Sequence, residues 1–336
     1  MAGNWGYRSY RGRTPRWKYA LAAVLVIVIL AAVGFIILQE NVVYDESGMP
    51  HLRLPEKAEE PVKEEVELTI QPPEGPGELR AVQVPAGRLT QEVWQKARQA
   101  APLCSGAAVT LKDDTGKVWF DSTAAVSGTT DTAPDTAEVL EQIAGEETYA
   151  LARLSCFHDS RAANLDIEGM GLKNTGGYIF YDGANSQWMD PAKPAARQYL
   201  CQMAVEAAEL GFDEVLLTDV SYPTVGKLDK IAYGEGEKSG HLAAFLQEVR
   251  AALEPYGVML SVELPEAAIA AGEDAAAGIS LVQIAPLVDR VYARTEPEKA
   301  ASLEEAVKAA GGTAFVPELT APLPEGQGSF LLLPET

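Results

Sequence analysis

Two carboxylates in this sequence follow apolar runs closely enough to serve as reactive groups. Asp219 comes just after the run Glu214 to Leu217, and Glu263 closes the run Val258 to Glu263. If both runs are parallel strands of a barrel, their carboxyl ends meet at one mouth, where barrels keep their active sites. Glycoside hydrolysis uses two carboxylates about 5 to 9.5 Å apart, one as acid and the other as base or nucleophile. We therefore take Glu263 and Asp219 as the candidate catalytic residues.

Three other residues near predicted strand ends are candidates for binding substrate. Asp113 lies in Asp-Asp-Thr-Gly, which is also a good turn sequence. Asp159 follows another predicted strand and could equally cap a helix. Tyr222 lies three residues after Asp219, in the same predicted loop. The turn and the helix cap are structural alternatives that the sequence leaves open.

A Gly- and aromatic-rich insertion between Gly176 and Pro191 interrupts the regular pattern of the chain. It predicts a short hairpin in a loop after a strand, at the end of the barrel where active sites lie. Tyr181 and Trp188, if exposed there, could stack on sugar rings. The alternative is that these rings pack over the barrel mouth.

Short apolar or β-branched runs alternate with amphipathic stretches from Glu78 onward. The predicted strands are Leu79 to Val84, Ala107 to Leu111, Tyr149 to Cys156, Glu214 to Leu217, Val258 to Glu263, Arg290 to Ala293, Thr313 to Val316 and Phe330 to Leu333. The predicted helices are Leu89 to Ala100, Thr136 to Ala144, Ala195 to Leu210, His241 to Tyr256 and Ser302 to Ala310. Gly211 and Gly257 lie just past two of them, as helix C-caps do.

This alternation predicts a parallel sheet with right-handed crossovers. Eight units in residues 78–336 match the size of a TIM (β/α)8 barrel, so the expected fold class is α/β with a TIM-like barrel domain. A doubly wound open sheet is the alternative. It is disfavoured because no G-x-G-x-x-G loop follows the first strand.

Several stretches resemble a bacterial family of predicted glycoside hydrolase barrels, relatives of α-amylase-like enzymes that are often exported or membrane-anchored. Trp188 to Pro191 reads W-M-D-P where the family typically has W-V-D-P, and Ala204 to Val215 is similar to its E-A-A-x-L-G-F-D-E. Leu111 to Val118 resembles its D-I-K-D-x-x-G-x-V. The resemblance runs from about Glu78 to about Arg294. It implies a barrel that acts on, or binds, cell-envelope or environmental polysaccharide.

The same resemblance implies a loss of carboxylates. The family's Q-F-D-Y-[IV]-R-F-P aligns with Leu216 to Pro223, so its Asp position holds Thr218, and Asp219 falls where the family has Tyr. The Asp of D-I-K aligns with Thr110, whereas Glu263 keeps the acid of the family's S-A-D. A Thr hydroxyl cannot replace a carboxylate nucleophile. Two interpretations stay open: a hydrolase in which a local bulge displaces Asp219 into the site, and a catalytically degenerate barrel that serves as a glycan-binding or structural envelope module.

The sequence predicts neither a cofactor nor a metal site. Its cysteines and histidines are few and widely separated, with no ligand spacing typical of zinc. They are Cys104, Cys156, Cys201, His51, His158 and His241.

An apolar segment near the N-terminus predicts a single transmembrane helix. Tyr19 to Leu38 carries no charged residue and, at about 1.5 Å per residue, reaches roughly 30 Å, the thickness of the hydrocarbon core. Residues 1–18 contain Arg and Lys but no acid, so the positive-inside rule keeps this tail in the cytoplasm. A cleaved signal peptide is the alternative, because Ala31 to Gly34 supplies small residues. Either way the remainder of the chain is expected outside the cytoplasm, and the cell membrane is the predicted location.

Residues 39–77 are rich in Pro and Glu and are expected to form a disordered linker between the anchor and the barrel. Five of the 27 Lys and Arg precede the anchor, so 22 remain against 48 Asp and Glu, a formal charge near −26. That charge opposes binding to nucleic acid and to anionic lipid surfaces. The expected partners are the lipid bilayer, through residues 19–38, and a polysaccharide.

Overall fold

The computed structural model describes residues 42–44, 50–52, 75–145, 148–324 and 327–334. The predicted tail 1–18, the predicted transmembrane segment 19–38 and most of the predicted linker lie outside these residues. Among the described residues, no helix has both the length and the apolar character needed to cross a bilayer. The chain divides into two compact units, Met1–Leu68 and Thr69–Thr336.

In the first unit the described residues form a two-stranded antiparallel pair. β1 (Val42–Tyr44) pairs with β2 (Pro50–Leu52), with Val43 opposite His51. The β-branched and aromatic residues of β1 favour extended backbone. Both strands lie within the predicted linker, residues 39–77.

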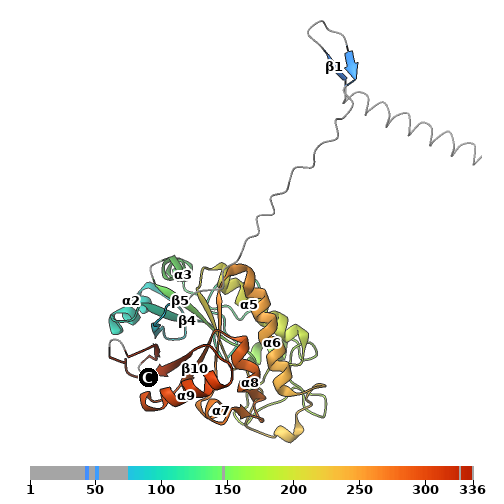
Figure 1. Cartoon of the computed structure of the whole chain (residues 1–336). Helices are drawn as coiled ribbons and strands as arrows, with labels where there is room; N and C mark the ends of the chain where they lie inside the picture. The colour runs from blue at the N-terminus through green and yellow to red at the C-terminus, as the bar shows by residue number, and fades with distance from the viewer. Residues whose placement is uncertain (1–41, 45–49, 53–74, 146–147, 325–326, 335–336) are drawn as a thin grey trace, which may run out of the picture. The chain divides into compact units, whose positions relative to one another are not determined.

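In the second unit eight parallel strands close into a barrel (Figure 1). The strands are β3 (Arg80–Gln83), β4 (Gly106–Lys112), β5 (Tyr149–Ser155), β6 (Glu214–Thr218), β7 (Met259–Glu263), β10 (Arg290–Arg294), β11 (Phe315–Leu319) and β12 (Phe330–Leu332). The last strand, β12, pairs in parallel with the first, β3, and this pairing closes the ring. All eight predicted barrel strands are confirmed, and the closed barrel rules out the open sheet.

Helices cover the outside of the ring of strands (Figure 1). They are α2 (Gln91–Ala100), α3 (Thr136–Gly145), α4 (Ser160–Leu165), α5 (Pro194–Glu209), α6 (Lys238–Leu253), α7 (Glu266–Ala271), α8 (Leu281–Ile284) and α9 (Pro297–Ala309). The five longer helices were predicted, whereas α4, α7 and α8 are too short to show a helical period in the sequence. Gly211 and Gly257 have φ of 92° and 65°, the left-handed conformation expected just past a helix. A small hairpin of β8 (Glu273–Asp274) and β9 (Ile279–Ser280) follows α7.

Side chains along each barrel strand alternate between the helices and the lumen. Outward residues such as Val109, Leu217 and Val262 belong to the main core beneath the helices. Inward residues form a separate apolar cluster inside the barrel. Its members are Leu79, Ala81, Ala108, Leu151, Leu216, Tyr292, Val316 and Leu331. Residues two positions away from these on the same strand also face the lumen.

A buried ion pair lies inside the barrel at the amino ends of the strands. The Arg290 guanidinium pairs with the Glu214 carboxylate, and their side chains are 7% and 0% exposed. Glu214 also accepts hydrogen bonds from the hydroxyls of Ser261 at 2.6 Å, Tyr292 at 2.8 Å and Tyr149 at 2.9 Å. Because the buried charge has both a charged partner and three hydroxyl donors, this end of the lumen is structural.

The segment that leads into β3 is fixed to the same end of the barrel. Arg290 Nη2 donates to the Pro76 carbonyl at 3.2 Å. Gly75 lies against the same guanidinium, so that a Cβ there would meet Arg290 Nη2. The chain therefore enters the barrel at the end opposite the carboxyl ends of the strands.

The insertion after β5 lies on the loop where it was predicted, but it is not a regular hairpin. Its backbone makes isolated antiparallel bridges, such as Lys173 with Ile179. Asp182 Oδ1 accepts the N–H groups of Ala184 and Ser186 at 2.8 Å each. A side chain thus satisfies backbone donors that a second strand would otherwise bind, and the segment folds as successive turns.

Candidate active site at the barrel mouth

A cavity of about 610 Å³ opens at the carboxyl ends of the strands. We call this opening the barrel mouth. It is lined by Gln83, Arg153, Glu263, Arg294, Glu318, Thr320, Leu333 and Pro334. These residues lie on, or just after, strands β3, β5, β7, β10, β11 and β12, at the end where barrels place their reactive groups.

Arg153 on β5 is the centre of the polar groups in the mouth. Its Nη1 lies 2.9 Å from Glu318 Oε1 and 3.4 Å from Gln83 Oε1, and its Nη2 pairs with Glu263. The Glu263 side chain is 26% exposed, whereas that of Glu318 is 2% exposed. Of the two carboxylates that share this guanidinium, Glu263 is therefore the one that a substrate can reach.

The pKa of Glu263 is raised to about 7, chiefly because burial disfavours its charged form. The Arg153 guanidinium acts in the opposite direction, and the carboxylates of Glu318 and Asp219 add to the rise. A carboxyl with this pKa is partly protonated at neutral pH. It can therefore donate a proton to a leaving group, as a general acid does.

Asp219 turns its carboxylate toward the barrel lumen. Its backbone is left-handed, with φ of 53°, a conformation that Asp adopts more readily than most residues. Its Oδ2 accepts hydrogen bonds from the hydroxyls of Ser155 at 2.7 Å and Thr218 at 3.2 Å. Thr218 faces the lumen because it lies two residues after Leu216 on β6. A straight strand would have directed Asp219 to the opposite side from Thr218, and the left-handed residue removes that restriction.

The two threonines at the family's Asp positions also face the lumen. Thr110 lies two residues after Ala108 on β4 and pairs in register with Arg153 on β5. Thr110 and Thr218 are 9% and 8% exposed. The positions thus point into the barrel, but neither offers a carboxylate.

The structure brings Glu263 and Asp219 to the same end of the barrel, within reach of each other's charge. Their catalytic role stays a prediction. Arg153 and Glu318 were not among the residues predicted from the sequence. Glu318 lies two residues past the predicted strand Thr313 to Val316, so a carboxylate at a strand end was the available signal. Nothing in the sequence marked Arg153 as a site residue, because a single basic residue within a predicted strand usually faces solvent.

Two predicted substrate-binding residues have the structural roles that were the alternatives. Asp113 Oδ1 accepts the N–H groups of Thr115 at 2.9 Å and Lys117 at 3.0 Å, which closes the predicted turn. Asp159 caps α4 and is 0% exposed. Its Oδ2 lies 2.9 Å from the buried Lys112 Nζ. In this conformation Asp159 is not accessible to a substrate.

Trp188 and Tyr222 are buried. Trp188 is 8% exposed, stacks on His158 with ring centroids 4.4 Å apart, and donates from Nε1 to Asp182 Oδ2 at 2.9 Å. The Tyr222 hydroxyl lies 2.8 Å from His241 Nδ1, and its side chain is 0% exposed. Stacking of Trp188 on a sugar required an exposed ring, and this ring packs beneath its own loop instead. The structure therefore agrees with the alternative interpretation, in which this ring has a packing role.

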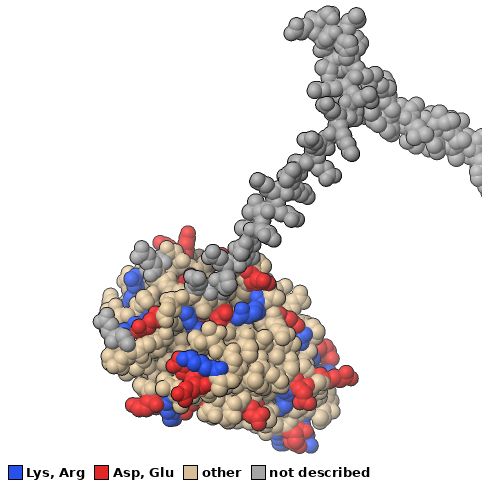
Figure 2. All heavy atoms as spheres, in the orientation of Figure 1, with Lys and Arg blue, Asp and Glu red and all other residues tan. Residues whose placement is uncertain are grey.

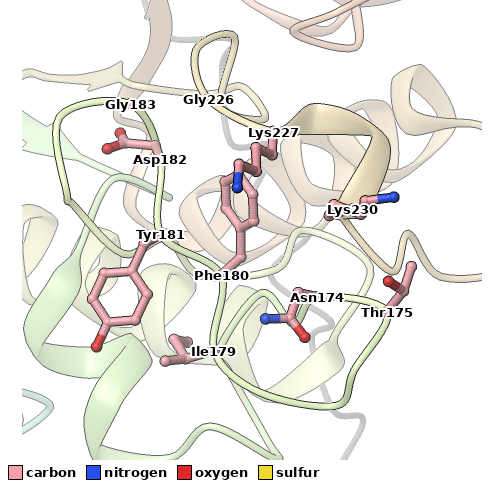
Figure 3. A pocket seen from close by; sticks show the side chains of 10 residues that line it. All are labelled: Asn174, Thr175, Ile179, Phe180, Tyr181, Asp182, Gly183, Gly226, Lys227 and Lys230. Atoms are coloured by element: carbon pink, nitrogen blue, oxygen red, sulfur yellow. The ribbon is translucent and has the colours of Figure 1, made fainter.

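Tyr181 is exposed, as expected, with 48% of its surface accessible. It lines a second cavity, of about 590 Å³, between the loops that follow β5 and β6 (Figure 3). Asn174, Phe180 and Asp182 line it from the first loop, and Lys227 lines it from the second. Of the predicted substrate-binding residues, Tyr181 is the one that presents an aromatic face to solvent.

Charged side chains of both signs are interspersed over the face of the barrel domain shown in Figure 2. The ionisable groups that line the mouth likewise comprise two arginines and two glutamates. Within the part of the chain that the structure describes, no group of three or more His, Cys, Asp or Glu could hold a metal ion.

Among solved structures, the chain is similar to the PgaB (BpsB) glycoside hydrolase domain from Bordetella bronchiseptica. The TM-score is 0.53 at 16% identity, over 77% of this chain and 94% of that one, and this likeness shows the fold. A hypothetical protein from Ruminiclostridium thermocellum is 26% identical over 52% of this chain and 91% of its own, with a TM-score of 0.46. No curated protein matches the sequence.

A family model described as "Putative glycosyl hydrolase domain" matches residues 103–302, more than half of the chain. The matched region contains Arg153 and Glu263 of the mouth, and also Asp219, whereas Glu318 lies beyond it. The chain therefore belongs to this glycosyl hydrolase domain family.

Proposed function

We propose that the protein is a membrane-anchored glycoside hydrolase that acts on polysaccharide, with Glu263 as general acid and Asp219 as the second carboxylate. One observation carries the proposal. Glu263, at the mouth, is partly exposed, has a pKa of about 7 and lies within the electrostatic influence of Asp219. The family description supports a sugar substrate. The same proposal includes a more specific relationship to α-amylase-like enzymes.

In this mechanism Glu263 gives its proton to the glycosidic oxygen as the bond from that oxygen to the sugar breaks. Asp219 stabilises the positive charge that develops on the sugar, either by bonding to it or by activating the water that adds. Water supplies the hydroxyl of the product. Where Asp219 has bonded to the sugar, Glu263 takes the proton of this water; where Asp219 activates the water, Asp219 takes that proton and Glu263 regains its own from solvent. Arg153 is a positioning residue, because it holds Glu263 and Glu318 on one guanidinium.

Glu263→Gln and Asp219→Asn test the assignment against a panel of polysaccharides and aryl glycosides. Each variant should lose about 10²- to 10⁴-fold in kcat, the usual contribution of a positioned acid or base. Glu266→Gln is the matched control, because Glu266 lies three residues after Glu263 and pairs with Lys299 on the outside of the barrel. Wild-type activity should fall as pH rises through about 7, since Glu263 then loses its proton. Full activity in Glu263→Gln would rule out this acid.

A second candidate function is glycan binding without turnover. The observation that favours it is that Thr110 and Thr218 face the lumen at the family's Asp positions while Arg153 engages both glutamates of the mouth. This protein would be retarded on polysaccharide in a native gel but would release no reducing sugar. Product formation by the wild type, lost in Glu263→Gln, would exclude it.

The proposed location is the cell membrane, with residues 1–18 in the cytoplasm and the barrel outside. It is supported by the apolar segment 19–38 and its basic flank. Protease added to intact cells should remove the barrel domain, and the remaining fragment should stay in the membrane fraction. Recovery of the chain in the washed soluble fraction, cleaved near Ala31 to Gly34, would instead favour a cleaved signal peptide.

A further inference from the structure

The cavity between the loops that follow β5 and β6 is held in shape by backbone contacts. The Thr175 N–H donates to the Lys230 carbonyl at 2.8 Å, and the Gly183 N–H donates to the Val225 carbonyl at 3.3 Å. Gly226 has φ of 103°, and a Cβ there would lie 2.9 Å from Gly183 N, so only glycine fits. Strands β5 and β6 are parallel neighbours, and both loops follow their carboxyl ends. The pocket therefore lies at the same end of the barrel as the mouth.

The polar groups that remain unused in this pocket are mainly donors. The Lys227 ammonium has no ion-pair or hydrogen-bond partner within residues 75–145, 148–324 and 327–334. Asn174 Oδ1 accepts the N–H groups of Gly176 at 2.9 Å and Tyr178 at 3.2 Å, which leaves the amide N–H groups of its side chain for a ligand. Figure 3 shows Lys227 and Asn174 on opposite loops of the same pocket.

The carboxylate that lines the pocket is already hydrogen-bonded within its own loop. Asp182 Oδ1 is occupied by the N–H groups of Ala184 and Ser186, and its Oδ2 by Trp188 Nε1. Figure 3 shows this carboxylate pointing away from Lys227. A free cation and a free amide donor, with the carboxylate already bonded, suit a group that only accepts hydrogen bonds, such as a carboxylate.

Aromatic side chains add an apolar wall. The Tyr181 ring is 48% exposed, while the neighbouring Phe180 is 3% exposed and packs into the core. A half-exposed tyrosine presents a flat face to which the C–H face of a sugar ring can bind. The pocket therefore combines a surface for a ring with donors for an anion.

We propose that this pocket is an accessory site for an anionic sugar unit of the uronate class, with the ring on Tyr181 and the carboxylate at Lys227 and Asn174. This accessory site rests on the proposed function in one respect: the polymer that it binds is the one presented to the mouth. The acidity of the protein as a whole does not prevent such binding, because at physiological ionic strength charges beyond about 8 Å are screened.

Polygalacturonate and its methyl ester test the site, because they share a backbone and differ in charge. Affinity of the full-length protein for each is measured by affinity electrophoresis. Wild type should bind the acid at least about tenfold more tightly than the ester, the value of about one charge-assisted hydrogen bond. Lys227→Met and Tyr181→Ala should each weaken binding to the acid by about tenfold. Lys96→Met removes the same charge from α2 and should leave binding unchanged.

Glu263→Gln separates this site from the mouth. It should bind the acid polymer as wild type does, even if it lacks activity. If neither wild type nor any variant hydrolyses a glycan, but the acid polymer is still preferred and Lys227→Met and Tyr181→Ala still weaken its binding, the proposed function fails and the accessory site stands. Equal binding of acid and ester, no binding of either, or Lys227→Met behaving like Lys96→Met would overturn the accessory site, whatever the activity. Unchanged thermal unfolding of each variant confirms that the fold is intact.

Discussion

Replacing Glu263 by Gln should change how the stability of the protein depends on pH. The pKa of this carboxyl rises from 4.5 to about 7 on folding, so the folded state holds the proton more tightly than the unfolded chain. The stability that this group contributes is therefore fully present below about pH 4.5 and is lost as pH rises through about 7. Gln cannot ionise, so the variant does not suffer that loss.

The magnitude follows from the same values. At about 1.4 kcal/mol for each tenfold change in proton affinity, a rise from 4.5 to about 7 corresponds to about 3 kcal/mol. The free energy of unfolding of Glu263→Gln minus that of wild type should increase by about this amount between about pH 4 and about pH 8. Taking the difference between the two free energies of unfolding removes the contribution of carboxylates that titrate in both proteins.

Urea unfolding across this pH range, followed by circular dichroism, measures the difference. Glu266→Gln is the control with the opposite sign. The Lys299 ammonium and the Thr295 hydroxyl lower the pKa of Glu266. The free energy of unfolding of wild type should therefore increase relative to that of Glu266→Gln as pH rises. A Glu263→Gln difference that stays constant with pH, or that falls, would refute the assignment of a raised pKa and with it the case for a general acid.

Three further predictions concern buried charges and one turn. Glu214→Leu should lower the free energy of unfolding by about 3 to 5 kcal/mol in urea titrations, because it leaves the Arg290 guanidinium buried without its carboxylate; a loss below about 1 kcal/mol would contradict this. Asp159→Asn keeps a capping oxygen but abolishes the ion pair with Lys112, so its thermal midpoint should lie between those of wild type and Asp159→Ala. A midpoint of Asp159→Asn equal to that of wild type would mean that the ion pair adds nothing. Gly116→Ala should be destabilised in the same assay, since φ is 78° there and a Cβ would lie 2.1 Å from Asp159 Oδ1; a wild-type midpoint would show that the turn can shift.

The parts of the fold that depend on neighbouring residues were predictable. The barrel strands show up as short apolar runs, and Gly211 and Gly257 occupy the left-handed positions that end helices. The Asp113 turn and the Asp159 cap were both recognised as alternatives, because each depends on N–H groups within four residues of the carboxylate. Helix α4 was missed because its six residues are too few to establish a period.

The candidate site was predictable only in part. A carboxylate at the end of a parallel strand is brought to the mouth by the fold class alone, so Glu263 could be chosen from the sequence. The direction of Asp219 could not, because the alternation rule for a strand placed it opposite Thr218 and its left-handed φ of 53° reverses that expectation. Trp188 shows the same limit, since an aromatic residue in a loop has no sequence signal that separates exposure from packing.

By itself, the sequence determined the order of strands and helices, the barrel class, the acidity of the chain and the strand ends that carry acids. All of these are set by local periodicity and composition. Only the tertiary structure decided that Arg153 joins Glu263 to Glu318, which lie 110 and 165 positions from it along the chain, and that Lys227 and Tyr181 line the same pocket. The physical reason is closure. The pairing of β12 with β3 brings distant strand ends around one mouth, and the charges and pKa values there depend on which side chains meet inside it.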